Sequence, residues 1–528
     1  MFFCMRNYIF LLASLIIAFD LVVPFNIVHG SKTICSQTLY PELCNSLVST
    51  KADESTLDET TTLNLRGTSL QVTLAQASHA HELISNMDVS SLSELGKSAW
   101  ANCVQLHEDT IELVNKSISL DSSTRSSSSD AQTWLSAAFA NQQTCLNGFL
   151  DFNLHEEVQK MPIFSNDLSK YISNSLAINK ATTLDHATIN GRGRRLLSSH
   201  GFPKWVTAAD RRLLQSTTAT MKANIVVAQD GSGSYKTIKE AVAAAGGGGG
   251  RFVIYVKKGV YREQVVISKS KKNLMFIGDG IDQTIVTGSK NAQDGSTTFD
   301  SATFAVSGDG FVVKDMTFEN TAGPQKHQAV ALRSGSDFSV FYRCSFKGYQ
   351  DTLYVYAKRQ FYRDCTIYGT QDFIFGDAVA VLQNCNIYIR KSLSGQRNTV
   401  TASGRSDPNE NTGIIIQNSR VSGDSQSGKS FLGRPWQKYS RTVFMKCSLD
   451  SVIDPAGWLP WSGNFALSTL YYGEYMNTGA GAGTGGRVKW PGYHVITSAT
   501  EASKFSVGNF LSGNSWIPAS GVPFTSGV

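Results

Sequence analysis

Two Gln-Asp pairs are the residues of this chain best suited to do chemistry. Gln350-Asp351 and Gln371-Asp372 lie 21 positions apart (372 − 351) in similar local sequences. A fixed period near 20 residues, with short β-type segments and no helical spacing, is typical of a solenoid whose coils stack. Equivalent residues on stacked coils lie about 4.8 Å apart. The sequence therefore predicts that Asp351 and Asp372 sit one above the other.

Two stacked carboxylates in a partly buried cleft cannot both be ionised without a large cost. One should stay charged and the other should tend to hold its proton. The charged carboxylate can act as a nucleophile and the protonated one as a general acid. Arg434 is a candidate to keep one of them ionised, the amides of Gln350 and Gln328 could face an oxyanion, and Trp436 offers an apolar surface to a sugar ring.

Structural roles and other catalytic classes fit these residues less well. A single Asp in a solenoid turn is usually a turn-former, but two Gln-Asp pairs in register with an Arg-Pro-Trp element downstream favour a site. A Ser-His-Asp hydrolase is disfavoured, because the second half of the chain has only His327 and His494 and no Gly-x-Ser-x-Gly motif. The carboxylates therefore remain as the candidate catalytic groups.

The repeat that carries these residues predicts an all-β right-handed parallel β-helix. About six coils follow one template between residues 314 and 449, and a short helix near 237–245 can cap the N-terminal end. Cys344, Cys365 and Cys385 recur at the same spacing and should point inward. Neighbouring rungs suit either free thiols or a disulfide, so the residues alone leave both open.

The preceding residues 31–185 have helical spacing, as at Leu70, Leu74 and Ala77. An all-α antiparallel four-helix bundle is the expected packing. Four cysteines lie here in a setting that allows disulfides. Cys35 and Cys44 are near enough in sequence to pair locally, and Cys103 and Cys145 could tie two helices; the full set is Cys35, Cys44, Cys103 and Cys145.

The remaining segments indicate targeting and processing. Residues 1–30 resemble a secretory signal peptide; a membrane anchor is the competing interpretation, disfavoured because Asp20 and Pro24 interrupt the apolar run. Asn115 heads a glycosylation acceptor sequence. The linker 186–214 has two Arg-Arg-Leu-Leu sequences, which suit a processing protease, and leads to a domain at 215–528; the paired arginines are Arg194, Arg195, Arg211 and Arg212.

Charge divides unevenly along the chain. Residues 1–214 have 16 Lys+Arg and 20 Asp+Glu, a net −4, whereas residues 215–528 have 32 and 22, a net +10. The basic half favours an acidic partner. A polyanionic saccharide suits a secreted chain with scattered charges better than nucleic acid, which is not expected. No Cys-x-x-Cys or Cys/His cluster is present, so no metal or other cofactor is expected.

Five motifs follow one another in order in the second half of the chain. They are Gly259-Val260-Tyr261-Arg262-Glu263, Gln328-Ala329-Val330-Ala331-Leu332, Gln350-Asp351-Thr352-Leu353, Asp372-Phe373-Ile374-Phe375-Gly376 and Leu432-Gly433-Arg434-Pro435-Trp436. Together they resemble the plant pectin methylesterases over about 225–520. The helical region with its four cysteines, followed by the Arg-Arg-Leu-Leu linker, resembles the inhibitor-like pro-region of such enzymes.

The resemblance implies roles for the matching residues. Asp372 corresponds to the nucleophile that attacks the C6 methyl-ester carbonyl of a galacturonate unit, and Asp351 to the proton donor to methanol and later base for water. Gln350 corresponds to the oxyanion stabiliser, with Gln328 assisting and contacting substrate. Arg434 corresponds to the residue hydrogen-bonded to the nucleophile. Further substrate contacts are implied at Trp436 and Thr298.

The resemblance further implies a pectinesterase of the plant cell wall that releases methanol from the methyl esters of homogalacturonan. Its implied partners are pectin, its own pro-domain, a proteinaceous pectin methylesterase inhibitor and a subtilisin-like processing protease. A disulfide between Cys365 and Cys385 is also implied. The competing hypothesis is a glycoside hydrolase acting on a polyuronide with the same carboxylate pair, since a spacing near 5 Å also suits a retaining mechanism.

One position departs from the family pattern. Gln371 stands directly before Asp372, where the family usually has an aliphatic residue. Because Asp372 itself is kept, activity is expected, and the extra amide could change the nearby subsite.

Overall fold

The computed structural model describes residues 34–49, 60–120, 125–161, 163, 167–189, 223–246, 250–424 and 428–528. The expected signal peptide at 1–30 and the paired arginines Arg194, Arg195, Arg211 and Arg212 lie outside the described residues. Within these ranges, no helix is long and apolar enough to cross a membrane. The chain divides into two compact units, one of them mainly helical and the other mainly β.

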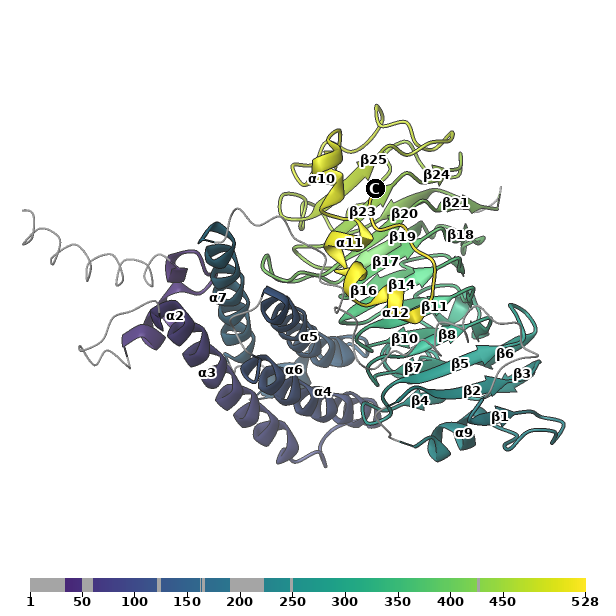
Figure 1. Ribbon diagram of the computed structural model, residues 1–528, viewed down its shortest axis with the longest axis horizontal. Coiled ribbons are helices and arrows are strands. Elements are labelled where there is room, and N and C mark those ends of the chain that lie inside the picture. The colour runs from purple at the N-terminus through teal and green to yellow at the C-terminus, as the bar shows by residue number, and fades with distance from the viewer. Residues whose placement is uncertain are drawn as a thin grey trace, which may run out of the picture. The chain divides into compact units, whose positions relative to one another are not determined.

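The N-terminal region is helical, as expected. Its elements are α2 (Pro41–Ser49), α3 (Thr60–Ser85), α4 (Glu94–Ile118), α5 (Arg125–Leu150), α6 (His155–Lys160) and α7 (Leu168–Ile189) (Figure 1). Buried polar contacts join helices of the first unit: Arg66 Nε donates to Asn179 Oδ1 at 2.8 Å, and Asn179 Nδ2 donates to Gln132 Oε1 at 2.7 Å. These bonds link α3, α7 and α5, and they satisfy polar groups that burial would otherwise penalise.

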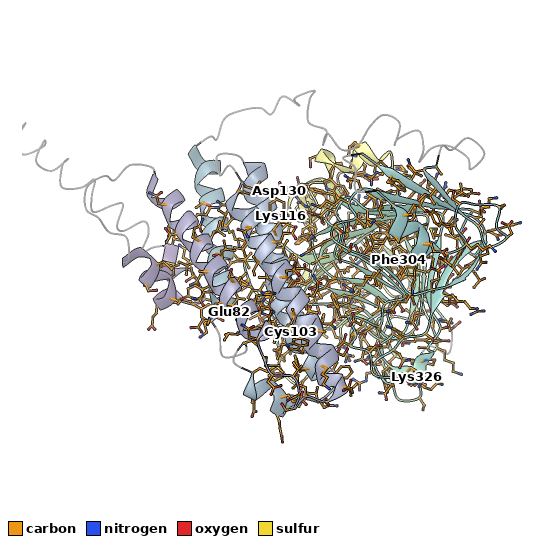
Figure 2. All side chains as sticks on the ribbon, turned by 90° about the horizontal axis from the view of Figure 1, so that it is seen from below. Glu82, Cys103, Lys116, Asp130, Phe304 and Lys326 are labelled. Atoms are coloured by element: carbon orange, nitrogen blue, oxygen red, sulfur yellow. A yellow bond between two sulfur atoms is a disulfide. The ribbon has the colours of Figure 1, made fainter. Side chains whose placement is uncertain are left out.

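Both disulfides expected in the helical region are present. Cys35 pairs with Cys44, and Cys103, labelled in Figure 2, pairs with Cys145. The second bond ties α4 to α5 across 42 positions of sequence. Cross-links of this kind restrict the unfolded chain more than the folded one.

The second unit contains a parallel β-helix with three sheets. The eleven-stranded sheet has the order β1 (Ile225–Val227), β2 (Phe252–Val256), β5 (Leu274–Gly278), β8 (Val312–Lys314), β11 (Ser339–Tyr342), β14 (Arg359–Arg363), β17 (Val379–Gln383), β20 (Gly413–Gln417), β23 (Arg441–Met445), β25 (Tyr471–Tyr475) and β26 (Tyr493–Val495). The eight-stranded sheet has the order β24 (Ser448–Leu449), β21 (Arg420–Gly423), β18 (Asn386–Ile389), β15 (Thr366–Gly369), β12 (Ser345–Lys347), β9 (Thr317–Asn320), β6 (Thr284–Gly288) and β3 (Gly259–Arg262). The seven-stranded sheet has the order β22 (Ser430–Gly433), β19 (Asn398–Ser403), β16 (Ile374–Gly376), β13 (Leu353–Val355), β10 (Leu332–Ser334), β7 (Phe304–Val306) and β4 (Val265–Ile267).

The register of these sheets is the one that the repeat predicts. Strand β13 pairs in parallel with β16 so that Leu353 lies beside Ile374, and β12 pairs with β15 so that Ser345 lies beside Thr366. Both pairings have the 21-residue offset. The sheets extend over more coils than the six expected, because the early strands from β3 to β7 do not repeat the Cys-bearing template that made the later coils visible in sequence.

A left-handed residue turns the chain into the next sheet after six neighbouring strands of the large sheet, β8, β11, β14, β17, β20 and β23. Its φ lies between +50° and +59° at Asp315, Arg343, Asp364, Asn384, Asn418 and Lys446. Asn and Asp adopt this conformation more readily than other non-glycine residues. The next residue then points inward, as Cys344 and Cys365 do. The turn thus sets which face of each strand enters the core.

Stacked apolar side chains fill the coil, and a short helix covers its N-terminal end. Phe341 stacks on Tyr362 with ring centroids 4.5 Å apart. The cap helix expected at 237–245 is α9 (Ile238–Ala244), which begins with a capping box between Thr237 and Glu240. Against the large sheet, residues of the short C-terminal helices α10 (Ala499–Ser503), α11 (Val507–Phe510) and α12 (Ile517–Ser520) form a second apolar cluster.

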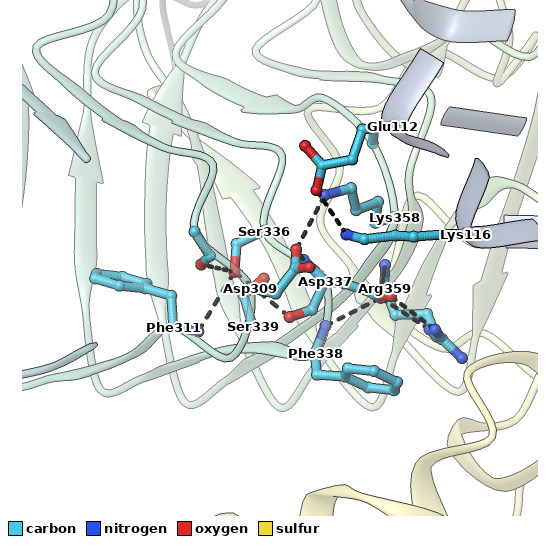
Figure 3. A network of polar contacts seen from close by, with 12 residues as sticks. Glu112, Lys116, Asp309, Phe311, Ser336, Asp337, Phe338, Ser339, Lys358 and Arg359 are labelled. Carbon is cyan, nitrogen blue, oxygen red and sulfur yellow. Dashed lines mark hydrogen bonds and ion pairs between the residues drawn. The ribbon is translucent and has the colours of Figure 1, made fainter. Parts of the chain in front are cut away.

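A buried ion pair fixes one of the turns that lead back into the large sheet. Arg359 donates from Nε to Asp337 Oδ1 at 2.9 Å and from Nη2 to Oδ2 at 2.7 Å (Figure 3). Nearby, Lys358 Nζ lies 2.9 Å from Asp309 Oδ1. The two-pronged geometry lets a charge pair replace water inside the fold.

The Cys365–Cys385 disulfide implied by the family resemblance is absent. Cys344, Cys365, Cys385 and Cys447 are all free and buried. The inward thiols instead donate to backbone carbonyls, as Cys365 Sγ does to the carbonyl oxygen of Phe341 at 3.4 Å. Burial raises the pKa of Cys365 and Cys385 well above the usual value, and that of Cys447 to about 12.

These four thiols should therefore resist modification in the folded protein. We expect an alkylating reagent at mildly alkaline pH to leave all four unlabelled, because reaction requires an exposed thiolate, and to label them fully in denaturant. Peptide mapping by mass spectrometry measures this. A cross-linked peptide containing Cys365 and Cys385 would contradict it; the Cys103–Cys145 peptide is the positive control for a disulfide.

Candidate active site

The two aspartates occupy equivalent turns on adjacent coils. Each lies between a strand of the eight-stranded sheet and a strand of the seven-stranded sheet, with φ of +63° at Asp351 and +51° at Asp372. The backbone N–H of Asp351 donates to the carbonyl oxygen of Gln371 at 3.1 Å. Aspartate tolerates this left-handed conformation, and the shared turn brings both carboxylates to the same cleft.

Asp372 is clamped from the next coils. Arg434 Nε lies 2.9 Å from Oδ1 and 3.1 Å from Oδ2, and its Nη2 lies 2.5 Å from Oδ2. Thr399 Oγ1 lies 2.6 Å from Oδ1. The side chain of Asp372 is only 7% exposed. A two-pronged guanidinium contact holds a carboxylate in its charged form and in one rotamer.

Asp351 has a different environment. The residue is buried, and desolvation raises its pKa well above the usual value; the negative charge of Asp372 raises it further. Both causes penalise a second anion in the cleft. Asp351 therefore holds a proton more tightly than an ordinary carboxyl group, and Asp372 is the carboxylate paired with a cation. The stacking argument predicts that one carboxyl stays charged and the other tends to hold its proton.

A cleft of about 260 Å³ lies over the pair. It brings together all seven residues singled out from the sequence: Thr298, Gln328, Gln350, Asp351, Asp372, Arg434 and Trp436. Gln350 Oε1 is buried and has no hydrogen-bond partner among the described residues. Buried polar atoms are nearly always satisfied, so this oxygen is suited to complete its bonding with a ligand.

Sequence reasoning missed several lining residues. Trp461 is 39% exposed and its ring centre lies 4.2 Å from the guanidinium of Arg434, while Phe375 packs against Trp436 with ring centroids 5.9 Å apart. Further lining residues are Phe299, Tyr354 and Ala402. A loop lengthens the coil between β18 and β19, so Thr399 follows Asp372 by 27 positions and escapes a search at a period of 20 or 21.

Gln371 also lines the cleft. Its Oε1 accepts from Gln396 Nε2 at 2.9 Å. The position expected to carry an aliphatic side chain is therefore polar and is tethered to the loop between β18 and β19.

Two helical segments belong to the same compact unit as the β-helix, residues Asp88–Cys103 and Gln143–Lys160. Within this unit the backbone N–H of Thr298 donates to Asp151 Oδ2 at 3.1 Å, and Asn102 Nδ2 donates to Thr297 Oγ1 at 2.9 Å. Asp151 thus places a third carboxylate on the cleft lining. By contrast, Asn115 is exposed on α4 and is not among the lining residues.

Comparison with known proteins places these features in a family. The pectinesterase family profile matches residues 224–514, and the plant invertase/pectin methylesterase inhibitor profile matches residues 31–178. The probable pectinesterase/pectinesterase inhibitor 6 of Arabidopsis thaliana is 54% identical over 523 residues, which cover 94% of each chain. Pectinesterase 2 of Citrus sinensis is 51% identical over 504 residues, again covering 94% of each.

Solved structures resemble the β-helical part. A pectin methylesterase from carrot is 59% identical with a TM-score of 0.58, covering 59% of this chain and 100% of the carrot chain. A pectin methylesterase from Aspergillus niger is 31% identical with a TM-score of 0.51, covering 57% of this chain and 97% of its own.

Changing Asp372 to asparagine should lower the pKa of Asp351. The substitution removes the neighbouring negative charge and leaves Arg434 unneutralised, and both effects favour the ionised form of Asp351. Infrared titration of the protonated carboxyl band measures the change, and the band should be lost at lower pH than in the unmodified protein. The matched control is Asp364→Asn, a left-handed aspartate at the other turn of the same coil. An unchanged titration in Asp372→Asn would refute the electrostatic coupling.

Proposed function

This chain belongs to the pectinesterase family, and from that premise we propose that Asp372, Asp351 and Gln350 together hydrolyse methyl esters of homogalacturonan. The chain is a carboxylic ester hydrolase, and the comparisons give no support to the glycoside hydrolase alternative. The observation that carries the assignment of roles is the asymmetry of the aspartate pair. Arg434 binds one carboxylate, and burial raises the pKa of the other carboxyl group well above its usual value.

In the first step, a carboxylate oxygen of Asp372 attacks the C6 carbonyl carbon of a methyl-esterified galacturonate. The carbonyl oxygen becomes an oxyanion, which the amide N–H groups of Gln350 and Gln328 stabilise. The bond from C6 to the methoxy oxygen then breaks. Asp351 gives its proton to that oxygen, so neutral methanol leaves and an anhydride joins Asp372 to the sugar.

In the second step, Asp351 is ionised and acts as the base. It takes a proton from water while the water oxygen attacks C6, and the anhydride bond to Asp372 breaks. The products are a galacturonic carboxyl group, which ionises in solvent, and the free Asp372 carboxylate. Asp351 has regained its proton, so the site returns to its starting state. Arg434 holds Asp372 in place throughout.

Binding of pectin draws on the aromatic and basic character of this half of the chain. Trp436 offers its ring to a sugar face, and Thr298 and Gln328 offer polar contacts at the cleft. The net +10 of residues 215–528 favours a polyanionic saccharide. Methyl-esterified homogalacturonan therefore fits both the local site and the long-range field.

We also propose the finer organisation of the chain. Residues 1–30 form a cleaved signal peptide, 31–185 an inhibitor-like pro-domain, 186–214 a processing linker and 215–528 the catalytic domain with a right-handed coil. Helices α3, α4, α5 and α7 form a four-helix bundle, supported by the buried bond from Arg66 to Asn179 and by that from Asn141 Nδ2 to the carbonyl oxygen of Leu106. The disulfides, the signal-like N-terminus and the acceptor at Asn115 support secretion to the cell wall and glycosylation.

The pro-region restrains the enzyme until the linker is cut. The contacts of Asp151 with Thr298 and of Asn102 with Thr297 support this proposal, because they occupy polar groups of the cleft that substrate would use. A subtilisin-like protease cutting at the paired arginines would separate the two parts. A separate pectin methylesterase inhibitor protein could bind at the same face afterwards.

Changing Asp372 to asparagine should abolish methanol release from methylated pectin, by about 10³-fold or more, because an amide is a poor nucleophile. Methanol and reducing ends are measured together on the same samples. The unmodified protein should release methanol without new reducing ends.

Asp364→Asn serves as the control for this experiment, since it changes the same residue type in the same coil outside the cleft. Both variants should unfold at similar temperatures. Substantial methanol release by folded Asp372→Asn would remove the nucleophile assignment, and new reducing ends would favour the glycoside hydrolase.

Changing Arg194, Arg195, Arg211 and Arg212 together to alanine should leave the secreted precursor uncut. The purified precursor should release methanol more slowly than the segment from Leu214 onward, and Asp151→Ala in the uncut precursor should restore part of the rate. Immunoblotting and a methanol assay measure these outcomes, with Asp167→Ala as the control. Normal cleavage of the quadruple variant would refute the processing sites, and equal rates for precursor and segment would refute the restraint.

A further inference from the structure

A second pair of carboxyl groups lies buried behind the cleft. Asp377 directly follows strand β16, and Glu410 lies in the loop between β19 and β20; the two residues are 5% and 1% exposed. Asp377 Oδ1 accepts from Thr412 Oγ1 at 2.5 Å. Glu410 Oε2 accepts from the backbone N–H groups of Ser406 and Asp407, both at 2.8 Å. One oxygen of each carboxyl is thus satisfied.

The other two oxygens have no such partner. Asp377 Oδ2 and Glu410 Oε1 are buried and accept no hydrogen bond within the described part of the chain. The two side chains are nevertheless close enough to hydrogen-bond to each other. Two ionised carboxylates cannot do so, because both are acceptors only. A single proton between them would satisfy both oxygens at once.

Nearby cations are engaged elsewhere. Arg405 donates to the backbone carbonyl oxygens of Glu410, Tyr439 and Pro408, at 3.0, 3.0 and 2.6 Å. Arg441 Nη1 donates to the carbonyl oxygen of Thr412 at 3.1 Å. Both guanidinium groups act on the acid pair through their charge, and so does the carboxylate of Asp407. None of these bonds reaches the two orphan oxygens.

We propose that Asp377 and Glu410 share one proton, and that this proton-bridged acid pair is a positioning element for the aromatic wall of the catalytic cleft. The aromatic wall consists of Phe375 and Trp436. The positioning role rests on the proposed function, because it assumes that the cleft is catalytic. The shared proton does not depend on that function.

The raised pKa of each carboxyl group agrees with a shared proton. Burial raises the pKa of Asp377 to about 6. Burial raises the pKa of Glu410 well above its usual value, and the charge of Asp377 adds to that rise. The proton therefore belongs to the pair rather than to either carboxyl group alone.

The acid pair joins the two backbone segments that support the aromatic wall. Gly376, between Phe375 and Asp377, accepts at its carbonyl oxygen from the N–H of Gly404 at 2.8 Å. The ring of Trp436 packs on Gly404 so closely that a Cβ there would lie 3.1 Å from two ring atoms. The bridge from Asp377 to Glu410 closes the same two segments from behind. Loss of the bridge would loosen the surface on which Trp436 rests.

The direction of the pH effect follows from the raised pKa values. A carboxyl whose pKa is higher in the folded state stabilises the fold at low pH, and this contribution is lost as pH rises through the folded pKa. For this pair the loss begins above the unfolded pKa values and continues through about 6 for Asp377 and through the raised pKa of Glu410. Two facing buried anions then repel each other.

Glu410→Gln keeps a hydrogen bond between the two side chains but removes the proton that can titrate. The amide oxygen of glutamine can accept the N–H groups of Ser406 and Asp407, and its NH₂ group then points at Asp377 Oδ2 with a permanent hydrogen atom. Glu410→Ala removes the bridge altogether. The full chain and these two variants are compared by infrared spectroscopy, by unfolding temperature against pH, and by KM and kcat on methylated pectin.

We expect Glu410→Gln to lose one protonated-carboxyl infrared band at neutral pH. Its unfolding temperature should stay constant over the pH range in which that of the unmodified chain falls as pH rises. Its KM should match the unmodified chain. Glu410→Ala should raise KM about fivefold, the scale of one aromatic contact, with a smaller change in kcat. The band of Asp351 remains in both variants and is identified by its loss in Asp351→Asn.

An unchanged infrared spectrum in Glu410→Gln, or parallel unfolding curves for it and the unmodified chain, would overturn the shared proton. An unchanged KM in folded Glu410→Ala would overturn the positioning role; if that variant does not fold, the same KM comparison is made with Asp377→Ser. Asp372→Asn tests the proposed function separately, because it should lose methanol release yet keep the infrared band and pH dependence of the acid pair.

Discussion

The parallel stacking of coils constrains everything else in the catalytic half of this protein. Hydrogen bonds between neighbouring rungs place equivalent residues about 4.8 Å apart, so a repeat of the same turn brings like residues together. For apolar side chains this produces continuous columns, such as the stack of Phe341 on Tyr362. At the turn that carries Asp351 and Asp372 it places two carboxyl groups side by side, and the fold must give them different proton affinities.

The inequality comes from residues of later coils. Arg434 and Thr399 reach only one of the two aspartates, whereas the other is left to burial and to the field of its neighbour. The two aspartates therefore differ in proton affinity because they lie at different positions along the axis of the coil. In the proposed reaction, the same division supplies a nucleophile and an acid from two identical side chains, and Asp351 exchanges its proton with methanol and water.

Buried charge recurs in this β-helix, and three solutions to its cost are visible. Arg359 and Asp337 form a two-pronged pair, and Arg487 and Glu474 form another that is almost fully buried. In the cleft, one aspartate is paired with a cation, whereas burial raises the pKa of the other. Asp377 and Glu410 use a proton instead of a cation, which makes their stability depend on pH in the opposite sense from an ion pair of a carboxylate with arginine.

The sequence alone determined the parallel β-helix, the preceding helical region and the aspartate pair. In a solenoid the strand register follows from the repeat period, and that period can be read from the sequence without knowing how the side chains pack. It also located Arg434 and Trp436 through a motif. Only the tertiary structure revealed the roles of Thr399, Trp461 and the acid pair of Asp377 and Glu410. In each case an irregular loop either interrupts the repeat before the residue or contributes the residue that it contacts. The free state of Cys365 and Cys385 was decided there as well: rung spacing permits a disulfide, but inward thiols that donate to carbonyl oxygens do not require one.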